Sequence, residues 1–116
     1  MVKIYIPSQG DIVYVNLNPT KGHEQKGTRP AIVVSNNIFN MNTKMVMICP
    51  ITSNTKYFPT HYELKESKIV KGSVLCEHIR SIDYETRKIK FIEKASDIDT
   101  LSVLMLTSAC IDNLTK

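Results

Sequence analysis

Short apolar runs separated by turn residues make up most of this sequence, and this pattern limits the chain to a small β-rich fold. Residues 11–18 alternate apolar with polar side chains and end in Asn-Pro, which predicts a strand that runs into a turn. Residues 30–35 are rich in β-branched side chains and predict a second strand, paired back across the intervening loop. Residues 44–51 form a continuous apolar stretch, which is typical of a central strand buried on both faces.

Further strands are predicted in the second half of the chain. They span residues 61–64, 73–76 and 87–93, and the second of them runs on into residues 77–83. The Asn-rich segment 36–42 is polar and predicts a surface connection. Five or six short strands between turns predict a small barrel or a strongly bent sheet.

The hydrophobic period changes near the C-terminal end and predicts one helix from about Asp97 to Asn113. Ser96 is a suitable N-cap, and acidic residues in the first turn suit the helix dipole. The recurring positions fall into two stripes, which comprise Ile98, Leu101, Leu104, Met105, Ser108 and Ile111, and Val103, Leu106, Cys110 and Leu114. Because two stripes are more than a one-sided surface helix needs, we expect the helix to be mostly covered, for instance by a second subunit.

The chain of 116 residues fits a single domain over residues 1–116, and its composition is that of a folded protein. No apolar run approaches the length of a bilayer, and residues 1–10 lack a signal-peptide core, so we expect a cytoplasmic protein with no membrane partner. The formal net charge of +4 favours an anionic partner. Cys49, Cys76 and Cys110 lie far apart without zinc-ligand spacing, so we expect buried free thiols and no metal or other cofactor.

The polar loop over residues 22–30 carries the densest chemistry in the sequence. Its imidazole, carboxylate, ammonium and guanidinium come from His23, Glu24, Lys26 and Arg29. Two glycines allow tight turns in the loop, and loops set on strands are where sites are usually built. A solvated hairpin connection explains the same composition equally well. Thr52 and Ser53 form a second polar segment, at the end of the buried strand 44–51.

With these segments in order, the chain resembles the MazF/PemK family of toxin endoribonucleases over nearly its full length. The matching segments are residues 10–13, 18–20, 22–30, 50–53 and 80–83. The resemblance implies an α+β, mainly β fold: an SH3-like barrel with a C-terminal helix. It implies a homodimer whose groove binds single-stranded RNA, and an antitoxin whose acidic, partly disordered C-terminal tail covers that groove. It also implies metal-independent cleavage, in which the ribose 2′-hydroxyl attacks phosphorus and leaves a cyclic phosphate and a 5′-hydroxyl.

The same resemblance implies roles for individual residues. Arg29 matches the catalytic arginine of the family, Thr52 its active-site hydroxyl, and Glu24 a carboxylate important for activity. His23 matches a histidine of the PemK branch, and Glu77 matches the acid before the Arg-x-Ile-Asp motif.

One position departs from the PemK pattern. Leu75 stands where that branch has an arginine two residues before the acid, so a mechanism that pairs this arginine with the acid cannot operate here. Arg29 is therefore the better candidate for stabilising the phosphorane, because a guanidinium matches two phosphate oxygens. The general base stays open between Glu24, His23 and Glu77.

RNA binding is expected from polar and charged residues along the groove. The candidates are His23, Gln25, Lys26, Thr28, Ser53, Glu77, Arg80 and Arg87. Glu77 is interpreted as an acceptor for a base edge, whereas Arg80 could equally have a structural role, paired with Asp83 or across the dimer. Tyr57 or Phe58 is available to stack on a base.

Two other functions are compatible with part of the pattern. A related barrel family poisons DNA gyrase by binding protein, but it lacks the arginine and threonine found here at Arg29 and Thr52. An inactivated RNA-binding module would bind oligonucleotides without cutting them.

Overall fold

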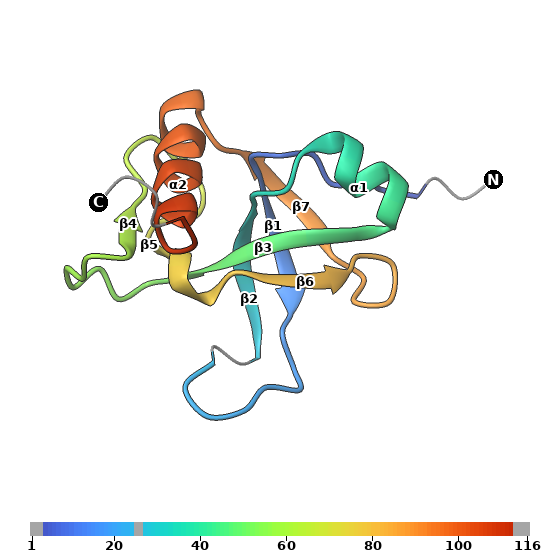
Figure 1. Cartoon of the computed structure of the whole chain (residues 1–116), viewed down its shortest axis with the longest axis horizontal. Helices are drawn as coiled ribbons and strands as arrows, with labels where there is room; N and C mark the ends of the chain where they lie inside the picture. Colours follow the sequence, from blue (N-terminus) through green and yellow to red (C-terminus); the bar gives the residue numbers. More distant parts are fainter. Residues whose placement is uncertain (1–3, 25–26, 113–116) are drawn as a thin grey trace.

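Antiparallel strands form the body of the protein, and two helices lie at opposite ends of the sheet (Figure 1). The computed structural model describes residues 4–24 and 27–112. Within these ranges the elements are β1 (Asp11–Asn16), β2 (Thr28–Val33), α1 (Asn37–Thr43), β3 (Met45–Thr52), β4 (His61–Glu63), β5 (Ser73–Leu75), the 3-10 turn η1 (Cys76–His78), β6 (Arg80–Asp83), β7 (Lys90–Lys94) and α2 (Asp97–Ala109). None of the helices in the described ranges is long and apolar enough to span a membrane.

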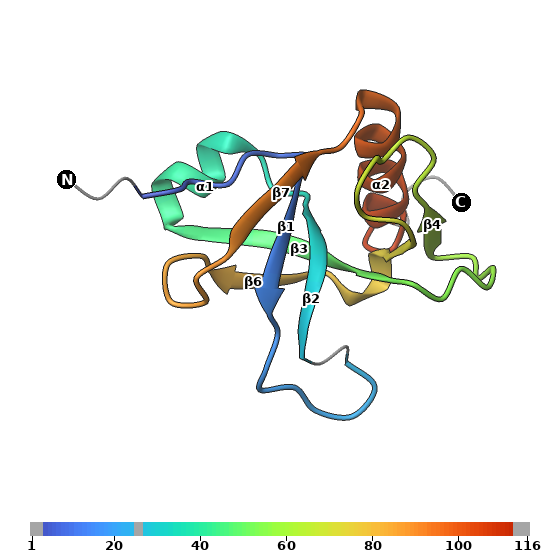
Figure 2. The same ribbon diagram turned by 180° about the vertical axis from the view of Figure 1, so that it is seen from behind.

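The sheet is ordered β4-β5-β3-β2-β1-β7, and β6 also pairs with β3 (Figure 2). The mainly β fold with a C-terminal helix is therefore confirmed, with seven strands in the described part of the chain instead of five or six. The additional strand arises because β3 is long enough to pair with two partners. Its first half pairs with β6, and its last residues, Ile51 and Thr52, pair with β5. The chain must step from one partner to the other, and η1 makes that step.

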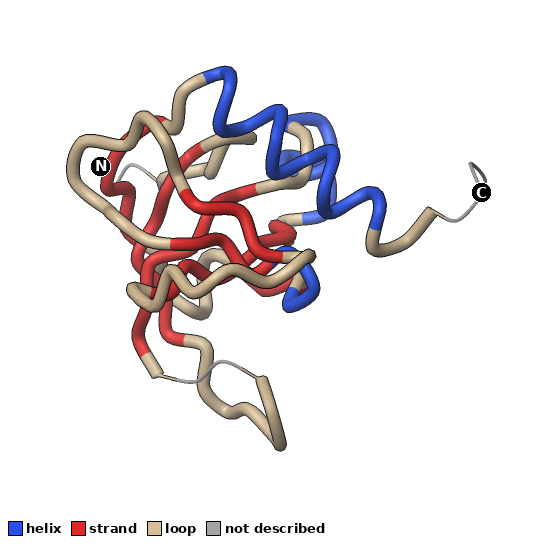
Figure 3. Tube along the Cα trace, turned by 90° about the vertical axis from the view of Figure 1, so that its left-hand side faces the viewer, coloured by secondary structure: helices blue, strands red, loops and turns tan. Residues whose placement is uncertain are grey.

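The core lies on both faces of the central strands, as expected for a continuous apolar run. Ile12 and Val13 are neighbours in β1 and belong to different clusters, since successive side chains point to opposite faces. One cluster includes Val103 of α2, and the other lies on the opposite face of the sheet. Figure 3 shows α2 lying across one side of the strands, and the loop between β1 and β2 projects away from the sheet.

Residues 36–42, predicted as a surface connection, instead contain helix α1. Asn36 caps this helix by accepting a hydrogen bond from the Phe39 amide at 2.8 Å. Asn40 is fully buried, and its amide group donates to the backbone oxygens of Pro7 and Ser35. The segment lies mostly at the surface, as predicted, but it is helical, and Asn40 is buried and hydrogen-bonded where the prediction treated it as solvated.

Helix α2 starts where the sequence predicts, with Ser96 accepting from the Asp99 amide at 3.0 Å. It ends at Ala109, before the predicted end at Asn113, which lies outside the described residues. Val103 and Thr107 face the core, whereas the stripe of Ile98, Leu101 and Met105 is at least 59% exposed. Within this chain the helix is therefore covered on one side only.

The three cysteines differ in burial. Cys49 and Cys76 are buried free thiols, as expected, whereas Cys110 is exposed. The expectation of burial fails for Cys110 because this residue lies just past the end of α2, where the core no longer covers the chain.

Two carboxylates hold the connection between β4 and β5. Asp99, fully buried, accepts from the Tyr62 hydroxyl and from the amides of Lys65 and Glu66. Glu93 accepts from three successive amides, those of Lys68, Ile69 and Val70, at 2.7 to 3.0 Å. Burial raises the pKa of Glu93, but these three hydrogen bonds outweigh it and hold the pKa below its ordinary value.

The lowered pKa of Glu93 predicts a pH-dependent loss of stability. Its contribution is complete above the pKa of an unfolded Glu, about 4.3, and is lost as pH falls through the lower folded value. We expect Glu93→Gln to lower the free energy of unfolding by about 1 to 3 kcal/mol at pH 7, and by much less at pH 3. Urea unfolding at both pH values measures this, with Glu63→Gln on the exposed face of β4 as the control. An equal loss at both pH values would contradict the account.

A substitution at Gly72 should also lower the stability of the protein, because the Gly72 backbone closely approaches the end of β3. Its φ is +148°, and a Cβ there would lie 2.2 Å from the Thr52 carbonyl oxygen. Gly72→Ala should therefore cost about 3 to 5 kcal/mol through strain and overlap together. Gly22, with φ +61° and nothing within 4 Å of a Cβ, is the matched control, and its alanine variant should cost about 1 to 2 kcal/mol. Thermal or urea unfolding of both variants tests this order, and equal losses would contradict it.

Candidate functional site

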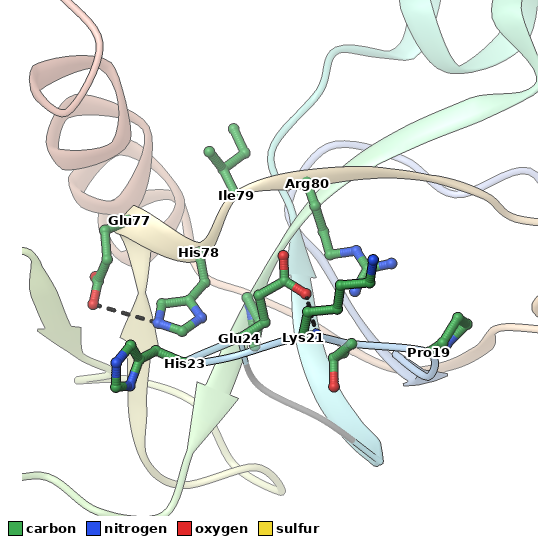
Figure 4. Close-up of a pocket in the computed structure, with 10 residues that line it drawn as sticks. Pro19, Lys21, His23, Glu24, Glu77, His78, Ile79 and Arg80 are labelled. Carbon is green, nitrogen blue, oxygen red and sulfur yellow. Dashed lines mark hydrogen bonds and ion pairs between the residues drawn. The ribbon is translucent and has the colours of Figure 1, made fainter.

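A cavity of about 610 Å³ lies between the β1–β2 loop and the segment from η1 to β6 (Figure 4). Its lining comprises Pro19, Thr20, Lys21, His23, Glu24, Pro50, Glu77, His78, Ile79 and Arg80. The cavity therefore brings together two imidazoles, two carboxylates, an ammonium and a guanidinium from two separate parts of the chain. Four of the predicted site residues lie here, namely His23, Glu24, Glu77 and Arg80.

The first wall of the cavity is the β1–β2 loop, which closes a turn on itself. The Lys21 amide donates to Glu24 Oε1 at 2.8 Å, and the Glu24 amide donates back to the Lys21 oxygen at 3.2 Å. His23 and Glu24 are both exposed within this turn. Two other predicted residues, Gln25 and Lys26, lie outside the described residues.

The second wall contains Glu77, whose two carboxylate oxygens have separate partners. Thr60 Oγ1 donates to Oε1 at 2.7 Å, and His61 Nε2 lies 2.8 Å from Oε2. His78 Nε2 lies 3.7 Å from the same Oε2. Burial raises the pKa of Glu77, but the hydrogen bonds from Thr60 and His61 outweigh it and lower the pKa below its ordinary value. Glu77 is therefore an ionised acceptor at neutral pH.

The two arginines predicted to bind RNA contact the base of the β1–β2 loop. Arg80 Nη1 donates to the Leu17 carbonyl at 3.0 Å and also lines the cavity. Arg87 Nη1 donates to the carbonyls of Asn16 and Asn18 at 2.9 and 2.5 Å, and it lines a separate, smaller hollow. These contacts give both guanidinium groups a structural role. For Arg80, this structural contact is with the Leu17 carbonyl and not the pairing with Asp83 or across the dimer that the sequence suggested.

Arg29 and Thr52 are outside the lining of the cavity, but they lie at the end of the ladder that borders it. The last pair between β2 and β3 joins Ala31 to Pro50, and Pro50 lines the cavity. Arg29 and Thr52 each stand two residues beyond this pair, so strand alternation directs both toward the face that carries Pro50. Thr28 and Ser53, the neighbours of these two residues, are exposed.

Sequence reasoning missed several residues of the site. Lys21 and His78 were detectable as neighbours of predicted residues, but Thr60 and His61 precede Glu77 by 17 and 16 positions. The pairing of β4 with β5, which sets His61 opposite Leu75, brings them to Glu77. Of the two aromatics proposed to stack on a base, Phe58 lies 5.0 Å from the His61 ring, and Tyr57 is 82% exposed.

The described residues hold no group of three or more His, Cys, Asp or Glu side chains arranged to bind a metal ion. The reactive groups of the cavity are instead imidazoles, carboxylates and cations at its two walls. This set can transfer protons near neutral pH and can bind an anion such as a phosphate.

The chain is similar to known toxins in sequence and in structure. The family described as PemK-like, MazF-like toxin of type II toxin–antitoxin system matches residues 8–106. The endoribonuclease toxin MazF of Escherichia coli K12 is 37% identical over 87 residues, which cover 75% of this chain and 78% of that protein.

Solved structures give the same result. The crystal structure of MazF from Deinococcus radiodurans superposes with a TM-score of 0.85 and 34% identity, covering 91% of this chain and 96% of that one. A MazE–MazF structure from the same organism has a TM-score of 0.77 and 29% identity, with 91% and 95% covered. The fold, the matched range and the identity over most of the chain lead to one conclusion: this chain belongs to the family of PemK-like, MazF-like toxins of type II toxin–antitoxin systems.

Proposed function

We propose that this protein is an endoribonuclease that cuts single-stranded RNA by attack of a ribose 2′-hydroxyl on the adjacent phosphorus, without a metal ion. The observation that carries the proposal is the cavity between the β1–β2 loop and the η1–β6 segment, which gathers proton-transfer groups beside cations. The relatives in sequence include an endoribonuclease toxin, which supports the same reaction class.

Arg29 is the proposed stabiliser of the transition state. The reaction adds negative charge to the phosphorus, and a guanidinium presents two parallel N–H groups to two phosphate oxygens. Thr52, directed toward the same face, adds a neutral hydrogen bond to these oxygens. The scissile phosphate would then lie at the border of the cavity where β2 and β3 stop pairing.

The three candidates for the general base lie in different structural environments. Glu77 has both carboxylate oxygens engaged and a pKa below its ordinary value, so it is a poor proton acceptor at neutral pH. His23 and Glu24 lie on the opposite wall and are exposed to an incoming ribose. We therefore assign the base to this pair and assign Glu77 to RNA recognition.

The proposed partners follow from the family and from the surface of α2. A toxin of a type II system is expected to have a cognate antitoxin, and an acidic tail would complement the cations of the cavity. The exposed stripe of Ile98, Leu101 and Met105 is suitable for contact with a second subunit in a homodimer.

Cleavage in chelator tests the proposed reaction most simply. Because the mechanism requires no divalent ion, incubation with long single-stranded RNA in EDTA should give fragments with 2′,3′-cyclic phosphate and 5′-hydroxyl ends. End-group analysis of the fragments provides the measurement. Intact RNA in EDTA, with cleavage restored by magnesium, would refute metal independence.

Replacing Arg29 tests the assignment of the transition-state stabiliser. Arg29→Ala should lower kcat by about 10²- to 10³-fold, the usual effect of losing one such group, while the fold persists. The kcat of Arg29→Lys should lie between those of Arg29→Ala and wild type, because lysine keeps the charge and loses the planar guanidinium. Lys90→Ala removes a cation from β7 and serves as the control. Wild-type cleavage by Arg29→Ala would show that the assigned role is wrong.

A further inference from the structure

The carboxylate of Glu77 is held in one orientation by two side chains from outside its own segment. Thr60 donates to Oε1 at 2.7 Å and His61 Nε2 contacts Oε2 at 2.8 Å, so each oxygen has a partner at hydrogen-bond distance. The side chains of His61 and Glu77 are 20% and 34% exposed. The pair therefore lies at the surface of the cavity wall and still has a defined geometry.

The backbone fixes these two partners before any ligand arrives. His61 stands opposite Leu75 in the β4–β5 ladder, and the Cys76 amide donates to the Thr60 oxygen at 3.1 Å. On its other side the His61 ring packs against Phe58, with 5.0 Å between ring centroids. The imidazole is thus held between an aromatic ring and the carboxylate, with Nε2 directed at Glu77.

This arrangement leaves Glu77 with acceptor capacity toward the cavity. An ionised carboxylate offers about four lone-pair sites and no donor, and the hydrogen bonds from Thr60, from His61 and from the Glu77 backbone amide leave capacity for a further donor. A base edge that presents N–H groups can use the remaining sites. A base edge that presents only a carbonyl oxygen at the same place meets a fixed negative charge and is disfavoured.

We propose that Thr60 and His61 are positioning residues that fix Glu77 as a reader of amino-bearing RNA bases, so that uracil is disfavoured at one position near the cleavage site. The inference rests on the proposed function, since it assigns a base-recognition role to one wall of the same cavity. Adenine, cytosine and guanine each carry an exocyclic amino group, whereas the single ring N–H of uracil is flanked by two carbonyl oxygens, which the fixed carboxylate repels.

Variants of similar shape test whether Thr60 and His61 position the Glu77 carboxylate or only support the fold. Thr60→Val removes the hydroxyl and keeps the shape, whereas Thr60→Ser keeps the hydroxyl. His61→Phe keeps a ring against Phe58 and removes the donor, whereas His61→Gln retains an N–H donor within reach of Glu77. Glu77→Gln replaces the fixed acceptor by an amide, which can also donate.

The first experiment maps cleavage sites on a random-sequence single-stranded RNA pool by sequencing. Wild type should deplete uracil about ten- to a hundredfold at one position near the cut, the usual discrimination of a paired base contact. Glu77→Gln, Thr60→Val and His61→Phe should lose most of this depletion, whereas Thr60→Ser and His61→Gln should retain it. Uracil tolerated at every position by wild type, or a depletion unchanged in both Thr60→Val and His61→Phe, would overturn the proposal.

The second experiment makes the result independent of cleavage. Oligonucleotides with 2′-O-methyl groups throughout cannot undergo 2′-hydroxyl attack, so fluorescence anisotropy with a cytosine and uracil pair measures recognition alone. Wild type should bind the cytosine oligonucleotide more tightly, and this preference should be lost in His61→Phe and retained in His61→Gln. Such a result supports the inference even if the protein leaves natural RNA intact. Intact natural RNA would refute only the proposed function. Equal binding of the two oligonucleotides by wild type would overturn it.

Discussion

The contacts of two guanidinium groups with the β1–β2 loop are the constraint on which the rest of the site depends. Arg80 and Arg87 come from β6 and from the turn after it, and they donate to three successive carbonyls, those of residues 16 to 18. Hydrogen bonds from a charged donor are stronger than neutral ones, so the loop base is held firmly against the second half of the chain. This link adds to the β2–β3 and β3–β6 ladders, which connect the two walls of the cavity through the sheet.

The two walls of the cavity differ in how firmly their side chains are oriented before RNA binds. Glu77 is oriented by Thr60 and His61, and these residues are fixed in turn by strand pairing. His23 and Glu24 are exposed on a loop, and the hydrogen bond to the Glu24 carboxylate comes from the Lys21 amide of the same turn. Such a division suits a site in which one wall selects a base while the other adjusts to the reacting ribose. It agrees with the roles proposed for the two carboxylates, Glu77 in recognition and Glu24 in proton transfer.

Much of the fold could be predicted because strand and helix periods are local properties of the sequence. The runs around β1, β2 and β3 and the N-cap at Ser96 are in place as expected. The helix at residues 37–43 was missed because the burial of Asn40 depends on Pro7 and Ser35, which no local pattern reveals. The break at η1 was missed for a similar reason, since it results from the pairing of β3 with two strands.

Some features of the candidate site could likewise be predicted from the sequence, and others depend on the fold. His23 and Glu24 are adjacent in the chain and both line the cavity, so their common location was predictable, whereas Arg29 lies outside this lining. The partners of Glu77 were not, because only the β4–β5 register brings His61 to it. The charge of Arg80 and Arg87 was evident, but which backbone carbonyls they contact depends on the folded position of the loop.

The central claim is that RNA lies across the cavity with its reacting phosphate at Arg29 and a base at Glu77. A crystal structure of the protein with a 2′-O-methyl oligonucleotide tests this claim most directly. The account predicts a phosphate oxygen about 2.7 to 3.2 Å from the Arg29 guanidinium and an amino-bearing base in contact with the Glu77 carboxylate. An oligonucleotide bound on another face, or a guanidinium remote from every phosphate, would contradict it.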